Sequence, residues 1–360
     1  MFYHLLYPLS DYVHALNVFR YITFRSAYAA ITALLISFLL GPLFLRMLRR
    51  RQLTAGLREF LPESHDCKAD TPTMGGLLIL IATLVPTLLW ARLDNEFIWI
   101  MVLATAWLGL VGFADDYLKV VKKRPKGLVA RYKLVGQLAL GLVVGTLIYV
   151  RGTIANPSYV EVPFLKNMVL SLGPAYIVFV MLVITASSNA VNLTDGLDGL
   201  AIGLALFCAL AFAAMSYITG HVKFSDYLNV PYIAGTGELA VYCSALIGAG
   251  LGFLWYNAHP AEVFMGDTGA LAVGGALGTL AVLIKKEIWL VLVGGLFVIV
   301  ALSVIIQILS VKLTGRRVFL MAPLHHHFQK RGWHESKVVV RFWIVGALFA
   351  LVALSTLKLQ

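Results

Sequence analysis

A short polar stretch near the middle of the chain, Asn189–Leu200, carries the residue types best suited to chemistry. It holds two carboxamides, two carboxylates and two glycines between apolar runs at about 173–191 and 200–219. Polar groups at such a junction either face water or do chemistry, because burying them in lipid costs several kcal/mol. A solvated loop would explain the glycines and one aspartate, but such loops are usually basic or plain. The composition of the stretch therefore favours a functional site.

Acidic residues recur at two further junctions of the same kind. Asp115 and Asp116 end the third apolar segment, Asp195 and Asp198 end the fifth, and Asp267 comes just before the eighth. Mg²⁺ prefers oxygen ligands, usually a few carboxylates together with substrate phosphate oxygens. Any one of these junctions is also explained by acids that cap helices or lie in solvent. The three together predict a divalent-cation site that faces phosphates.

The composition shows which elements position these residues. Hydrophobic residues make up 60% of the 360 residues and charged residues 13%, against about 25% charged in soluble domains, and the mean hydropathy is +0.84. We expect an all-α, polytopic integral membrane protein with one transmembrane domain over 1–360 and about ten transmembrane helices. No cleavable signal peptide is evident, and Cys67, Cys208 and Cys243 do not indicate a disulfide framework. The apolar segments are 22–45, 73–91, 97–114, 134–150, 173–191, 200–219, 238–256, 269–284, 288–311 and 339–357.

The distribution of basic residues predicts the orientation, because loops on the cytoplasmic side carry an excess of Lys and Arg. With both termini outside, most of the 29 basic residues and all three acidic junctions fall on the cytoplasmic side. The net charge of +11 fits anionic lipid headgroups, an anionic substrate, or both. The inward basic residues are Arg46, Arg49, Arg50, Arg51, Arg58, Lys68, Lys119, Lys122, Lys123, Arg124, Lys126, Arg131, Lys133, Lys312, Arg316, Arg317, Lys330, Arg331, Lys337 and Arg341.

Several motifs together resemble the bacterial phospho-N-acetylmuramoyl-pentapeptide-transferases, in the polyprenyl-phosphate N-acetylhexosamine-1-phosphate transferase superfamily. The resemblance covers essentially the whole chain. It implies transfer of phospho-MurNAc-pentapeptide from its UDP carrier to undecaprenyl phosphate in the bacterial cytoplasmic membrane, with Mg²⁺ as cofactor and lipid I and UMP as products. It also implies ten helices, both termini outside and active-site loops in the cytoplasm. The motifs are Pro62–His65, Thr71–Gly76, Asp115–Tyr117, Asn189–Leu200, Gly250–Trp255 with Asn257, Phe264–Asp267 and Met321–His327.

The resemblance also implies roles for individual residues. Asp115 and Asp116 would organise the metal–phosphate centre or deprotonate the lipid phosphate, and direct displacement is favoured because that phosphate is already largely ionised near neutral pH. The implied metal ligands are Asp267, Asn192 and Asp195. The implied phosphate contacts are Lys68, Thr73, Lys119 and Lys133, although each lysine alone is explained by topology. The implied nucleoside pocket and further substrate contacts are Gly196, Leu197, Asp198, Asn257, Phe264 and Asn189.

The histidine triplet His325, His326 and His327 has two readings. Imidazoles commonly bind transition metals, but neighbours in an extended loop cannot all face one ion, so a zinc site is not expected. The family pattern places them beside the active site as hydrogen-bond donors to the substrate. A solvated loop is less favoured, because apolar Leu324 and Phe328 flank the triplet.

Two alternative functions remain open at this stage. A sibling enzyme would attach GlcNAc-1-phosphate to the same lipid, although Met321–His327 favours the muramoyl branch. A transporter would place carboxylates near the bilayer midplane in repeated halves, whereas here they cluster at segment ends and no repeat is visible. No nucleic-acid partner is expected, and a homodimer is left open. The chain departs from the family pattern at 59–61, Ala69–Asp70, Leu118, Ala270 and Val300. None of these departures removes one of the carboxylates of the predicted site.

Overall fold

A computed structural model describes residues 1–50, 71–124, 127–152, 154, 156–163 and 169–358. Nine described helices are long and apolar enough to cross a membrane, and the shorter apolar α3 makes the tenth crossing that the sequence predicts. The ten are joined by short helices, 3-10 turns and a two-stranded hairpin, β1 (Tyr159–Glu161) and β2 (Val169–Ser171). The crossings are α2 (Ile22–Arg50), α3 (Gly76–Trp90), α4 (Glu96–Val120), α5 (Ala130–Arg151), α6 (Ala175–Thr194), α7 (Leu200–Thr219), α9 (Leu239–Asn257), α10 (Gly266–Leu283), α11 (Trp289–Val293) with α12 (Gly295–Thr314), and α14 (Glu335–Ser355).

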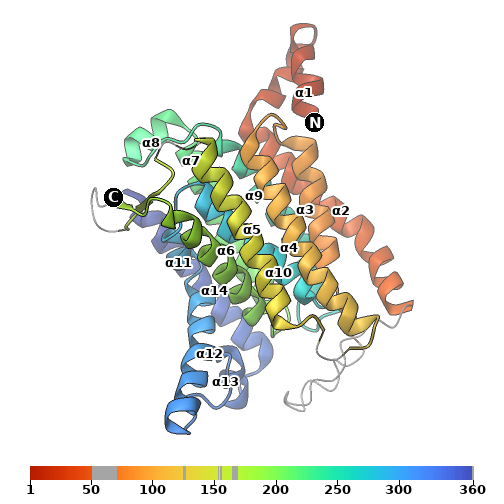
Figure 1. The fold of residues 1–360 in the computed structure, drawn as a ribbon. Helices are drawn as coiled ribbons and strands as arrows, with labels where there is room; N and C mark the ends of the chain where they lie inside the picture. Colours follow the sequence, from red (N-terminus) through yellow and green to blue (C-terminus); the bar gives the residue numbers. More distant parts are fainter. Residues whose placement is uncertain (51–70, 125–126, 153, 155, 164–168, 359–360) are drawn as a thin grey trace.

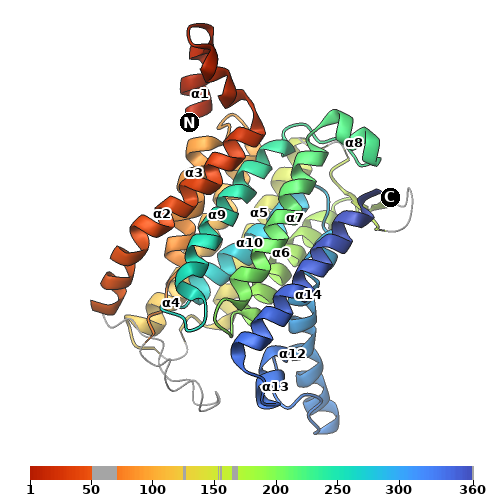
Figure 2. The same cartoon turned by 180° about the vertical axis from the view of Figure 1, so that it is seen from behind.

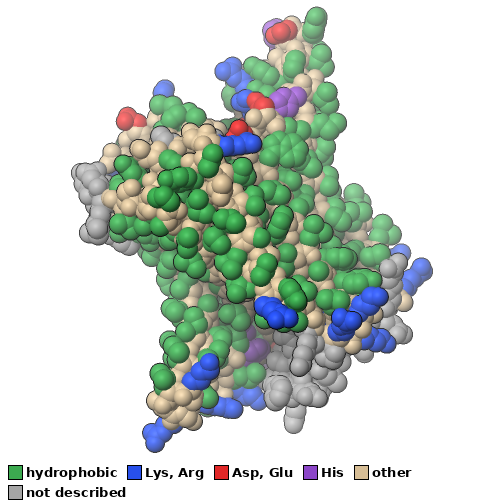
Figure 3. All heavy atoms as spheres, in the orientation of Figure 1, with side chains coloured by type: hydrophobic (Ala, Val, Ile, Leu, Met, Phe, Trp, Pro, Cys, Tyr) green, Lys and Arg blue, Asp and Glu red, His purple; other side chains and the backbone are tan. Residues whose placement is uncertain are grey.

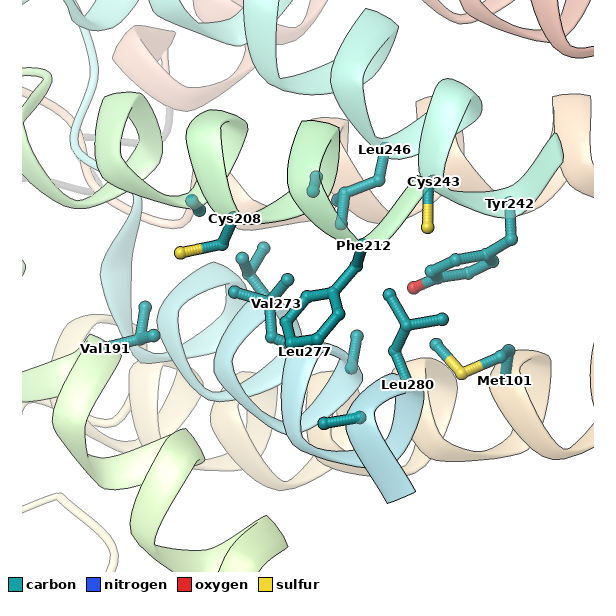
Figure 4. Packing of buried hydrophobic residues seen from close by; sticks show 14 of the residues in the cluster. Met101, Val191, Cys208, Phe212, Tyr242, Cys243, Leu246, Val273, Leu277 and Leu280 are labelled. Atoms are coloured by element: carbon teal, nitrogen blue, oxygen red, sulfur yellow. The ribbon is translucent and has the colours of Figure 1, made fainter. Parts of the chain in front are cut away.

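Helix α10 lies in the middle of the bundle, and its main neighbours are α4 and α6 (Figure 1). Of the 18 residues of α10, 94% are buried inside the protein. Phe212 of α7 points toward Val273 and Leu277 of α10, while Tyr242 of α9 lies near Met101 of α4 (Figure 4). Most of the side chains around α10 are thus apolar, although Ser187 and Ser188 of α6 donate hydrogen bonds to the carbonyls of Gly274 and Leu271 along its length.

The less buried helices, among them α2, α12 and α14, form the outside of the bundle. Helix α2 packs along α9, and α14 packs along α7, as the view from behind shows (Figure 2). Hydrophobic side chains cover the middle of the face in Figure 3, and most of the Lys and Arg in that view gather toward the lower end. A broad apolar belt bounded by charges is what a protein surrounded by lipid requires.

The ninth apolar segment, predicted at 288–311, is broken. Helix α11 ends at Val293, and α12 begins at Gly295 after Gly294. Helix α12 then continues past the bundle toward α13 (Leu324–Lys330), which lies beside it (Figure 1). The break explains why this segment is long for a single straight crossing.

Buried ion pairs join elements at the end of the bundle opposite the acidic junctions. Arg25 near the start of α2 makes two hydrogen bonds, of 2.6 and 2.7 Å, to Glu238 of the turn before α9. Lys286, after α10, contacts Glu161 of β1. Lys358, beyond α14, lies over the ring of Tyr227 in α8 (Val222–Leu228). The Met1 amino group donates to the Leu88 carbonyl near the end of α3, so both ends of the chain lie at this end of the bundle (Figure 1).

Candidate active site

The last turns of α4 and the first turn of α10 meet at one end of the bundle. Gly112 permits the approach, because a Cβ at this position would lie 2.2 Å from the backbone oxygen of Asp267. Asp115 and Asp116 of α4 thereby reach Asp267 of α10, and all three are buried. One oxygen from each lies within 4.8 Å of the others. Carboxylate oxygens at this spacing can hold a divalent cation.

The three carboxylates have different partners, and those of Asp116 are all in α10. Its Oδ1 accepts a hydrogen bond from the Asp267 N–H at 3.1 Å. Its Oδ2 accepts from the Thr268 N–H at 2.9 Å and from the Thr268 hydroxyl at 2.6 Å. The first N–H groups of a helix have no partner within it, so Asp116 caps α10 from another helix. This carboxylate therefore positions Asp267.

Two lysines lie between the other two carboxylates. Lys133 Nζ is 2.6 Å from Asp267 Oδ2 and 3.0 Å from Asp115 Oδ2. Lys119, one turn after Asp115, pairs with that residue, and its Nζ is 3.4 Å from Asp267 Oδ2. Asp115 Oδ1 accepts a 2.7 Å hydrogen bond from the Leu128 N–H. The centre thus combines buried negative charge with two ammonium groups that can meet phosphates.

The Thr71–Gly76 motif lies against the start of α10 and completes this edge of the site. The Phe264 N–H donates to the Pro72 carbonyl at 2.8 Å, and the Gly75 N–H donates back to the Phe264 carbonyl at 2.9 Å. Thr73 is buried, and its hydroxyl would lie 3.0 Å from a Cβ on Gly266. The backbone pairing explains why motifs far apart in the sequence form one surface.

A second polar cluster lies where the Asn189–Leu200 stretch turns into α7. Asp198 Oδ2 lies 3.0 Å from His259 Nδ1 and accepts a 3.2 Å hydrogen bond from the Ala261 N–H. The Asp198 N–H donates to Glu335 Oε1 at 2.9 Å. Asp198, His259 and Glu335 also bring ligand atoms within 4.8 Å of one another. These contacts fix the turn between α6 and α7 to the start of α14.

Asn257 holds the same turn from α9. Its carboxamide accepts a 3.0 Å hydrogen bond from the Gly199 N–H and donates one of 2.8 Å to the Val263 carbonyl. Gly196 and Leu197 lie in this turn, and Leu197 is buried. Asn257 therefore shapes the loop in which the nucleoside pocket is predicted, while direct contact with a nucleoside stays a prediction.

The histidine triplet lies in helix α13, and the expectation of an extended loop at these residues is wrong. His325 is fully buried, and a Cβ on Gly196 would lie 2.4 Å from its Nε2. Burial, with His326 nearby, holds the pKa of His325 well below its ordinary value. His326 Nδ1 lies 2.8 Å from Gln329 Oε1, and His327 Nδ1 accepts a 3.1 Å hydrogen bond from the Leu320 N–H. The rings of His325 and His326 lie side by side, with centroids 4.3 Å apart, and a Cβ on Gly196 would meet both of them, whereas His327 turns toward Leu320.

Asn189 belongs to a buried network within the bundle. Its amide donates to Gln137 Oε1 of α5 at 2.9 Å and to the Thr185 carbonyl at 2.8 Å. Gln137 Nε2 donates in turn to Ser188 Oγ at 3.1 Å. These bonds set the position of the last turns of α6, where Asn192 is partly buried.

The structure therefore brings some predicted residues together and leaves others apart. Asp195 is outside both groups of described acids and histidines whose ligand atoms converge. Lys68 lies outside the described residues. Four residues of the site were not singled out from the sequence, namely Thr268, His259, Glu335 and Gln137. None of these four has a sequence pattern that would indicate its contact. The Asp115–Lys119 pair does have one, because residues four apart lie on the same face of a helix.

Fold and site define a class: a multi-pass helical membrane protein with a carboxylate–lysine centre at one end of its bundle. A family model described as glycosyl transferase family 4 matches residues 98–285, and a phospho-N-acetylmuramoyl-pentapeptide-transferase signature matches residues 68–80. Curated phospho-N-acetylmuramoyl-pentapeptide-transferases of Citrifermentans bemidjiense, Pelobacter propionicus and Desulfotalea psychrophila are 55%, 54% and 52% identical, over 100% of both chains. The chain belongs to glycosyl transferase family 4 and to the phospho-N-acetylmuramoyl-pentapeptide-transferases.

Proposed function

We propose that the protein transfers phospho-MurNAc-pentapeptide from UDP-MurNAc-pentapeptide to undecaprenyl phosphate. A lipid phosphate oxygen forms a new bond to the sugar-bearing phosphorus, the bond from that phosphorus to UMP breaks, and lipid I and UMP leave. The observation that carries the proposal is the convergence of Asp115, Asp267, Lys119 and Lys133 at one end of the bundle. Transfer between phosphates requires charge neutralisation and positioning, which these groups supply.

A divalent cation fits this centre, and we propose Mg²⁺. Asp115 and Asp267 point oxygens at the same two ammonium groups, so positive charge is already favoured at that position. Asp116 has both oxygens engaged by α10 and would support the site from behind. Asn192 stays a predicted further ligand. Such an ion would neutralise the charge of the phosphates during transfer.

The chain's own groups account for the rest of the reaction. Lys119 and Lys133 would hold the donor phosphates as point charges. The acceptor phosphate is largely ionised near neutral pH, so direct attack needs little help from a base, and Asp115 is available for any remaining proton. The turn at 196–199, fixed by Asn257, would receive the nucleoside, with Phe264 stacked on the uracil.

We also propose that this end of the bundle faces the cytoplasm. Among the described residues, the Lys and Arg that the sequence assigns inward lie at the ends of α2, α4 and α12, at the starts of α5 and α14, in α13 and in the loops beside these ends. That excess is the usual mark of the cytoplasmic side. The ten crossings then leave both termini outside, in a bacterial cytoplasmic membrane.

The deciding experiment is a UMP-release assay with purified protein, both substrates, and Mg²⁺ present or chelated. We expect UMP and lipid I only with both substrates and the metal. UDP-GlcNAc as the sole donor should give no product, and turnover with it would favour the GlcNAc-1-phosphate branch. Flux into proteoliposomes without UMP release would favour a transporter and refute the proposal.

A further inference from the structure

The carboxylates at the end of α4 and the start of α10 are neutralised by the protein itself. Lys133 bridges Asp115 and Asp267 with contacts of 3.0 and 2.6 Å, and Lys119 contacts the same two carboxylates. Two negative and two positive charges therefore share one small volume. The negative charge of Asp116 is instead stabilised by hydrogen bonds from the first turn of α10.

The ammonium groups contact the same oxygens that a divalent cation would need. Both lysines reach Oδ2 of Asp115 and Oδ2 of Asp267, the atoms that face each other across the centre. A cation that enters must either displace these ammonium groups or lie beside two like charges in a partly buried site. Both courses oppose metal binding as long as the lysines have no other negative partner.

These lysines are also more exposed than the ion-paired lysines at the opposite end of the bundle. The side chains of Lys119 and Lys133 are 30% and 20% exposed, and each lies at a helix end. Lys285 and Lys286 are 7% and 1% exposed, and each also packs on an aromatic ring. A long, partly solvated stem can carry its ammonium group to a new partner without unfolding a helix.

We propose that Lys119 and Lys133 hold the metal position in the substrate-free protein and move onto the donor's phosphates when metal and donor bind. The proposal rests on the function proposed above, and it adds a coupling between the two ligands. A donor phosphate gives the lysines a new partner and so frees the carboxylates for the metal. Metal and nucleotide should then each raise the affinity of the other by the same factor.

The test measures Mn²⁺ binding to the full-length purified protein by electron paramagnetic resonance, first without nucleotide. Lys133→Met removes one competing ammonium group and should tighten Mn²⁺ binding at least about tenfold, which corresponds to about 1.4 kcal/mol. Lys133→Arg keeps the charge and should stay near the wild-type affinity. Lys122→Met removes a charge from an exposed position just beyond α4 and is the matched control. Asp267→Asn gives the background from adventitious sites.

A second measurement adds UMP as the phosphate probe. Wild-type protein should bind Mn²⁺ several-fold more tightly with UMP, and Lys133→Met should lose most of that gain. Two results of the measurement without nucleotide would overturn the proposal. One is unchanged or weaker Mn²⁺ binding by Lys133→Met, and the other is that Lys133→Arg tightens Mn²⁺ binding as much as Lys133→Met does. If Lys133→Met does not fold, as judged by its melting temperature, Lys119→Met is read in the same way. Absence of UMP release by the wild-type protein would refute the proposed function alone, since these comparisons need no turnover.

Discussion

Asp116 Oδ2 accepts hydrogen bonds from both the backbone N–H and the hydroxyl of Thr268, at 2.9 and 2.6 Å, across a separation of 152 residues in the chain. The negative charge lies at the N-terminus of α10, where the helix dipole favours it. Asp267 is the residue just before Thr268, so the same contact determines where its carboxylate points. In this site one acid positions another.

The first prediction tests that contact. Thr268→Val keeps the side-chain shape but removes a hydrogen bond to a charged group, which contributes about 1.5–3 kcal/mol. We expect a lower melting temperature and a reduced kcat, both recovered by Thr268→Ser. Thermal unfolding and UMP release measure the two effects. Equal behaviour of the Val and Ser variants would show that the hydroxyl does not hold α10 in place.

The second prediction concerns Asp267 itself. Asp267→Asn removes a charged group from the proposed phosphoryl-transfer centre and should cost at least about 3 kcal/mol of transition-state stabilisation, a loss of at least about a hundredfold in kcat. The variant should still insert and fold. Asp226→Asn, at an exposed position in α8, removes an equal charge at the opposite end and should stay active. Near-normal lipid I formation by Asp267→Asn would remove this residue from the site.

The third prediction concerns sidedness. Residues 115–133 and 312–338 should be cytoplasmic, and residues 151–172 and 220–237 should lie outside. Single cysteines at the exposed positions Lys122 and Lys223, in a background without the native cysteines, can be probed with an impermeant thiol reagent on intact cells. Only the cysteine at 223 should react. Labelling at 122 would contradict both the orientation and a cytoplasmic site.

The fourth prediction concerns the nucleotide. Stacking of an aromatic ring on a base is worth about 1–3 kcal/mol, so Phe264→Ala should raise the donor KM roughly tenfold to a hundredfold. Phe264→Tyr keeps the ring and should bind the donor nearly normally. Donor KM and melting temperature are measured for both variants. An unchanged KM with a lowered melting temperature in the Ala variant would mean that Phe264 serves stability instead.

The fifth prediction follows from the buried His325. Because its pKa in the folded protein is held below the unfolded value of about 6.5, the unfolded chain binds the proton more readily as pH falls. The stability contributed by neutral His325 is therefore present above about pH 6.5 and is lost on acidification. Between pH 7.5 and 5.5 the melting temperature should fall more for wild type than for His325→Gln. Parallel decreases would show that His325 is not the group that titrates.

The sequence predicted the ten crossings and the three acidic junctions, because apolar length and charge placement are properties of local stretches. It did not predict that Asp116 caps α10, since the donors lie 151 and 152 residues further along the chain. Glu335 and His259 likewise gave no local signal. Each is a polar residue near a helix end, and its contact with Asp198 depends on how the helices pack. Asn189 belongs to a recognisable motif, but its partner Gln137 lies in another helix and reaches it only because α5 and α6 pack side by side.

Helix α10 has the lowest mean hydropathy of the nine long spans, 1.3, and is also the most completely enclosed by its neighbours. Contact with lipid stabilises such a segment only weakly, whereas packing against α4 and α6 stabilises it strongly. The ribosome makes both of those helices before α10. We therefore expect its stable insertion to follow that of those two helices. Asp267 at its start is paired with lysines of α4 and α5, so we expect the contacts proposed for catalysis to be formed during the same assembly step.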